Sequence, residues 1–130
     1  MTGRSAVAQM VKMVAAEVAE GQLGDASQLA MEAIGRSPEL TADLLALIIK
    51  EGTKKRPDDK VVSAYGFLLG HALEQVRYAV DRKSPGGLTL ADDLRRTLLA
   101  AGADGRISAP IMLLVLHLFA AAKLEMGDEL

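Results

Sequence analysis

The stretch that decides the fold is Ile111 to Ala122, IMLLVLHLFAAA, in which every residue except His117 is apolar. A surface helix shows an apolar stripe and a polar back, whereas a helix that is apolar on all sides must be covered all round. Lipid is a poor cover, because a bilayer span takes about 20 apolar residues and this run lies between Pro110 and Lys123. We therefore expect the segment to be the buried centre of a small helical domain, with surface left over for another chain.

The composition predicts one domain with a core of aliphatic side chains. A chain of 130 residues buries roughly two thirds of its unfolded surface. The sequence has no cysteine, which excludes a disulfide framework, thiol catalysis and thiolate metal sites. Half of the residues are hydrophobic but only 3% are aromatic, so Ala, Leu, Val, Ile and Met must build the core. These residues favour closely packed helices over sheets.

The charge balance and the amino-terminal residues narrow the function classes. A formal charge of −2 gives no basic excess of the kind that nucleic-acid-binding proteins carry, and aromatic stacking platforms are scarce. Residues 1–9 contain one arginine and no apolar core, so we expect no signal peptide. The sequence therefore predicts a cytoplasmic protein that binds neither nucleic acid nor membrane.

Apolar spacing and helix-end residues predict six helices and no strand. The expected helices span residues 5–21, 25–35, 37–52, 58–83, 89–101 and 108–126, with Ser5, Asp25, Ser37, Asp58 or Asp59, Thr89 and Ser108 at their starts. Most connections are short, so successive helices should pack as antiparallel neighbours. The fold prediction is a single compact all-α domain over residues 1–130, either an irregular antiparallel bundle or a short stack of helical hairpins.

Two histidines give the only candidate for chemistry. His71 and Glu74 lie three residues apart on the fourth expected helix, and Tyr78 lies one further turn along the same face. His117, on the sixth helix, could meet them across the bundle and form a weak zinc or general-base site. Di-iron bundles use the opposite order, Glu-x-x-His, on two helices with further glutamates, so this pattern does not match them. The alternative is that each histidine is a core or boundary residue.

The densest basic cluster, Lys54, Lys55 and Arg56, offers donors that suit a phosphate group. Asp58 and Asp59 follow directly and cancel much of its field. We expect a solvated surface of mixed charge at this connection.

Gly66 and Gly70 lie inside the longest expected helix, where each glycine costs about 1 kcal/mol relative to alanine. Glycines four residues apart share one helix face and allow another helix to approach closely. The sequence therefore predicts a helix contact at this pair, either within the chain or with a second copy; a kink is the remaining alternative.

The polar residues are mostly accounted for by helix caps, turns and solvated faces, which leaves no catalytic, metal or cofactor set. We therefore expect a non-enzymatic helical interaction or scaffold domain that binds another protein or itself. The alternatives are a small metal-dependent or acid–base enzyme that uses His71, Glu74 and His117, and a helical bundle that binds an apolar ligand between the fourth and sixth helices.

Overall fold

The computed structural model describes residues 3–21 and 24–124. These residues form six α-helices without a strand, which confirms the predicted all-α fold. The helices are α1 (Gly3–Ala19), α2 (Asp25–Arg36), α3 (Leu40–Gly52), α4 (Asp59–Asp81), α5 (Pro85–Asp104) and α6 (Ala109–Ala121). Within the described ranges, no helix is long and apolar enough to cross a membrane.

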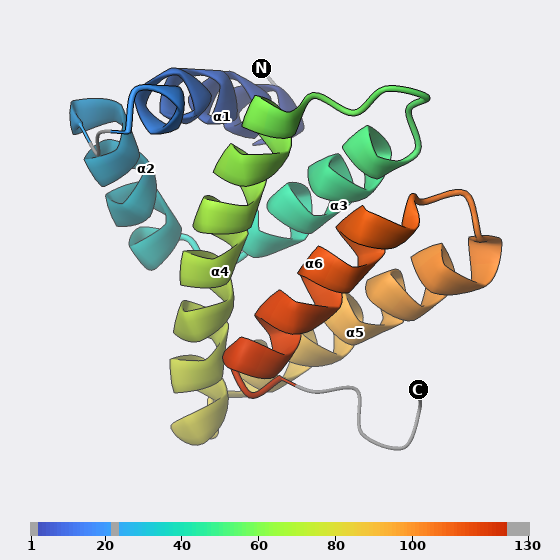
Figure 1. The fold of residues 1–130 in the computed structure, drawn as a ribbon. Helices are drawn as coiled ribbons and strands as arrows, with labels where there is room; N and C mark the ends of the chain where they lie inside the picture. The colour runs from blue at the N-terminus through green and yellow to red at the C-terminus, as the bar shows by residue number, and fades with distance from the viewer. Residues whose placement is uncertain (1–2, 22–23, 125–130) are drawn as a thin grey trace.

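The centre of the molecule is α4, which packs against each of the other five helices. Figure 1 shows α1 and α2 on one side of α4, and α5 and α6 on the other. With 23 residues, α4 is about 35 Å long, which gives five neighbours room along one axis. Its buried residues form two adjacent rows and thus a wide inward face: Ala64, Tyr65, Gly66, Leu68, Leu69, Ala72, Leu73 and Val76.

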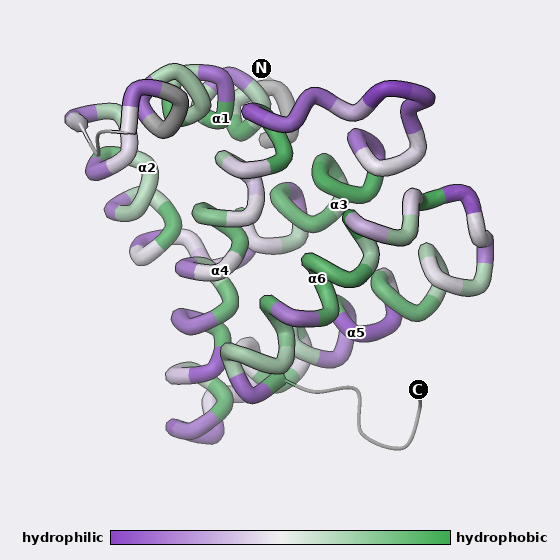
Figure 2. Tube along the Cα trace, viewed as in Figure 1, coloured by the Kyte–Doolittle hydropathy of each residue, from purple (hydrophilic) through white to green (hydrophobic). Residues whose placement is uncertain are grey.

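The prediction that the apolar sixth helix is the buried centre is wrong. Only Ile111, Val115 and Phe119 are buried in α6, spaced four residues apart on one face. Leu113, on the opposite side, keeps 66% of its surface exposed. α6 packs mainly on α4 and α3, so its outer side has no described neighbour. Figure 2 shows this helix coloured hydrophobic over most of its length, although it lies at the edge of the bundle.

The helix starts follow the predicted caps in part. Asp58 caps α4 as expected, because its carboxylate accepts hydrogen bonds from the backbone N–H groups of Lys60 at 2.9 Å and Val61 at 3.3 Å. Ser108 holds the N-cap position of α6, but its side chain makes no capping bond.

Four predicted starts are wrong. Ser5, the predicted start of the first helix, lies inside α1, which begins by Gly3. α2 has Gly24 at its N-cap, one residue before the predicted cap Asp25. α3 begins at Leu40, because the residues after Ser37 form a turn. α5 begins at Pro85 rather than near Thr89, since proline fits the first helical turn, where its missing N–H is not needed. The predicted end of the sixth helix at residue 126 lies outside the described residues, and α6 stops at Ala121.

Two glutamates tie neighbouring helices together across the α1–α2 and α3–α4 connections. Glu17 accepts hydrogen bonds from the backbone N–H groups of Gly24 at 3.0 Å, Ala26 at 3.0 Å and Ser27 at 2.8 Å, and from the Ser27 hydroxyl at 2.7 Å. It thereby caps α2 from outside that helix. Glu51 accepts in the same way from the N–H of Asp58 at 3.0 Å. These bonds fix the two connections on which the positions of α2 and α4 depend.

Candidate interaction surface

The outward side of α6 is a stripe of apolar and small side chains. Pro110, Leu113, His117 and Ala120 are all exposed and follow helical spacing along one side. We call these four residues the α6 stripe. Its one polar member, His117, lies in the middle. Leu114 and Leu118 border the stripe and are half-buried, because they lean over α4.

The α4 glycines lie beneath these bordering leucines. A Cβ atom added at Gly66 would lie 3.6 Å from Leu114 Cδ2, and one added at Gly70 would lie 3.4 Å from Leu118 Cδ2. The two pairs advance together along both helices, so α4 and α6 run in the same direction at this contact. The glycines therefore face α6 side chains of the same chain, and the first distance is an ordinary van der Waals separation.

A rim of mixed charge adjoins the amino-terminal end of the α6 stripe. A pocket of about 380 Å³ lies there between the α3–α4 connection, α4 and α6. Its lining residues are Lys54, Lys55, Pro57, Asp59, Val62, Ser108, Pro110, Ile111 and Leu114. Lys54 pairs with the buried Glu51 at 2.9 Å, which holds the rim in place. The cluster that the sequence presents as a solvated charge run thus borders an apolar hollow.

The four residues predicted as a catalytic or metal site lie on two helices, three on α4 and one on α6. On α4, His71 is half-buried, while Glu74 is exposed and Tyr78 is 51% exposed. His117 lies on the α6 stripe. Among the described residues, no group of three or more His, Cys, Asp or Glu side chains is arranged to hold a metal ion. The chemistry attributed to these residues stays a prediction.

In the part of the chain that the structure describes, two titratable groups have a shifted pKa, and each shift follows from a structural role. The Ser27 hydroxyl and the α2 backbone N–H groups lower the pKa of Glu17, because they stabilise its carboxylate. Burial, and to a lesser extent the charge of Glu51, raises the pKa of Tyr65. Helix capping and core packing account for both shifts, so neither identifies a catalytic group.

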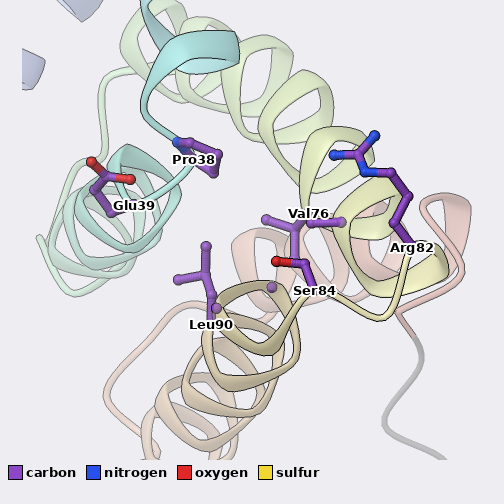
Figure 3. A pocket seen from close by; sticks show the side chains of 9 residues that line it. Pro38, Glu39, Val76, Arg82, Ser84 and Leu90 are labelled. Atoms are coloured by element: carbon purple, nitrogen blue, oxygen red, sulfur yellow. The ribbon is translucent and has the colours of Figure 1, made fainter.

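A separate pocket of about 360 Å³ lies where the starts of α3 and α5 meet the last turns of α4. Figure 3 shows Pro38, Val76 and Leu90 around the hollow, with the Glu39 carboxylate and the Arg82 guanidinium at its edges. Its lining residues contain no histidine and no second carboxylate, and therefore no acid–base pair. The sequence gives no local signal for this pocket, because its lining residues come from segments far apart in the chain.

The exposure of Leu113 was not predicted from the sequence either. Its only signal was the absence of a polar side in residues 111–122, which indicates that a cover is needed but not which side lacks one. Comparisons of the chain with protein-family models, curated proteins and solved structures gave no match.

Proposed function

We propose that this protein is a non-enzymatic helical interaction domain that presents the α6 stripe to another protein chain. The observation that carries the proposal is the exposure of Leu113. This leucine lies in the middle of an apolar helix and keeps 66% of its surface exposed to solvent. Contiguous apolar patches with a charged or polar rim are typical of protein-binding surfaces. Lys54, Lys55 and Asp59 supply such a charged rim at one end of the stripe.

A second apolar surface supports the choice of α6 by contrast. Met13 and Leu29 are exposed and line a groove of about 300 Å³ between α1 and α2. None of the described residues that line that groove is charged. The α6 surface combines an apolar centre with fixed charges at one end, and such charges give a partner a defined orientation.

The runner-up function is binding of a small apolar ligand. The pocket beside Lys54 favours it, because Val62, Ile111 and Leu114 form an apolar wall between α4 and α6. Its volume of about 380 Å³ is within the usual range for small-molecule sites. A fluorescent apolar probe that binds the wild-type protein with one-to-one stoichiometry, but does not bind the Leu114→Glu variant, would favour this alternative.

Affinity capture with matched variants tests the interaction proposal. Wild-type protein, Leu113→Glu and Leu88→Glu are immobilised and exposed to an extract of the cells that express the protein. Leu88 is a fair control, because it is a 45% exposed leucine on α5, away from the stripe. We expect a bound protein to be retained by the wild type and Leu88→Glu but lost on Leu113→Glu. Equal retention by all three proteins would contradict the proposal.

A further inference from the structure

We infer that the connection between α3 and α4, residues 53–58, is a hinged wall that opens the pocket beside Lys54, and that the buried Glu51 carboxylate is its latch. The pocket lies between this connection, α4 and α6. The inference depends on the hydrogen bonds of Glu51, on the exposure of the connection and on the fixed position of the other walls. It does not depend on what binds the α6 stripe.

Glu51 holds both ends of the connection with one carboxylate. Its Oε1 atom accepts a hydrogen bond from the Lys54 ammonium group at 2.9 Å, and its Oε2 atom accepts one from the backbone N–H of Asp58 at 3.0 Å. Glu51 lies in the last turn of α3 and is only 6% exposed, so the core holds it in place. Hydrogen bonds to a charged group are stronger than those between neutral groups. The two bonds therefore close the connection into a loop.

The middle of the connection has no comparable attachment. Residues 53–56 are exposed, and no hydrogen bond joins residues 55–57 to another described residue. Figure 2 shows the connection as a mainly hydrophilic loop. Segments with an exposed backbone and few buried contacts open separately from the core, at a low free energy. The wall is therefore free to move once Glu51 releases it.

The other walls of the pocket are fixed. The backbone N–H of Ser108, at the start of α6, donates to the Gly52 carbonyl at 2.8 Å. A Cβ atom added at Gly52 would lie 2.7 Å from Ile107 Cγ1 and 3.0 Å from Ile111 Cγ2, so α3 and α6 meet without spare room. Ile111 belongs to the buried core, and Val62 packs against it. The connection can therefore move while α3, α4 and α6 stay in place.

The charges around the pocket indicate which ligand the opening admits. Lys54 is paired with Glu51, and Asp59 lines the same pocket as Lys55, with the opposite charge. The lining therefore has no excess charge to attract an ion. Opening exposes the apolar side chains on α4 and α6, so the ligand class that fits is a small, uncharged, apolar molecule.

Amide hydrogen exchange, measured by NMR residue by residue, tests the latch. We expect the wild-type Asp58 amide to exchange faster than the buried amides of α4, because the connection opens without global unfolding. Glu51→Ala should speed this exchange at least about tenfold, since the amide loses a bond to a charged group. Lys54→Met leaves Glu51 with one partner fewer and should speed it about two- to fivefold. Lys55→Met is the matched control and should not change it.

Two results would overturn the latch. An Asp58 amide that exchanges at the rate of the core amides would mean that the connection opens only when the domain unfolds. Unchanged exchange in Glu51→Ala and Lys54→Met would mean that Glu51 does not hold it. The amides of α6 show whether each variant stays folded, and Lys54→Met changes a side chain that is 55% exposed, which the fold tolerates.

Binding of Nile red, an uncharged apolar dye, tests what the opening admits. Glu51→Ala should bind the dye about three- to tenfold more tightly than the wild type, because the open state is more populated. Adding Leu114→Glu should remove this gain, since Leu114 lines the pocket. Adding Leu88→Glu, on α5, should preserve it. No gain in Glu51→Ala, or a gain that survives Leu114→Glu, would overturn the inference.

Discussion

α4 carries charged residues along its length and lies at the centre of the molecule, whereas α6 is almost free of them and lies at the edge. Eight residues of α4 are buried, against three of α6. The difference comes from the number of neighbours rather than from composition. α4 confines its charges, such as Glu74 and Asp81, to one exposed row and buries the remainder of its surface under five helices. An apolar helix with few neighbours keeps its outer side exposed.

The largest expected effect on stability comes from a glutamate placed in α4, compared with a glutamate placed in α6. Leu69 is completely buried in α4, so Leu69→Glu should leave the domain largely unfolded, because an unpaired buried carboxylate costs several kcal/mol. Leu113→Glu should change the free energy of unfolding by no more than about 0.5 kcal/mol. Circular dichroism with urea denaturation measures both. Similar destabilisation by the two variants would mean that α6 is as central as α4.

The next effect concerns the contact that holds α5 against α4. A Cβ atom added at Gly87 would lie 2.6 Å from Ala79 Cβ and 3.0 Å from the Ala79 carbonyl carbon. Gly87→Ala should therefore destabilise the domain by about 1–3 kcal/mol, since the backbone must move. Gly86→Ala is the matched control, because nothing lies within 4 Å of the added atom. If both variants melt at the wild-type temperature, α5 packs more loosely on α4 than this geometry indicates.

Features that depend on residues close in sequence could be predicted here, and features that depend on contacts between helices could not. The cap at Asp58 was predicted correctly, because capping depends on residues close in sequence. The start of α5 was predicted wrongly although Pro85 at the first helical position is a local signal. The close contact of Gly87 with Ala79 joins different helices, and local signals do not contain it. The centre of the fold was misplaced for the same reason: hydropathy reports how apolar α6 is, not how many helices cover it.

Some components of the candidate surface could be identified from the sequence, but not their arrangement. The glycine pair and the basic cluster were both noted, but as separate features. Only the fold brings Gly66 to Leu114, and Leu114 to the pocket lined by Lys54. The exposure of Leu113 depends on which face of α6 meets α4, and a helix that is apolar on every side gives no indication of that face.

A smaller effect is expected at α2, far from the contact between α4 and α6. The hydrogen bonds from Ser27 and the α2 backbone lower the pKa of Glu17 below its ordinary value of 4.5. Its contribution to stability is therefore present above that pH and is lost as the pH falls through the lowered value. Glu17→Gln should lower the melting temperature at neutral pH and flatten its decline in acid. The exposed Glu20, which makes none of these bonds, supplies the control Glu20→Gln.

The smallest effect is the one that best tests how α6 lies on α4. An added Cβ at Gly66 would make only an ordinary contact with Leu114, at 3.6 Å, while alanine gains up to about 1 kcal/mol of helix propensity over glycine. Gly66→Ala should therefore stabilise the domain by a fraction of that amount. Gly70→Ala should gain less, because its Cβ lies 3.4 Å from Leu118. Gly70→Leu should reverse the sign, because the larger side chain must displace Leu118. Urea denaturation of the three variants gives the order. A loss of stability in Gly66→Ala would contradict this geometry, because it would mean that α6 leaves no room for a Cβ atom at Gly66.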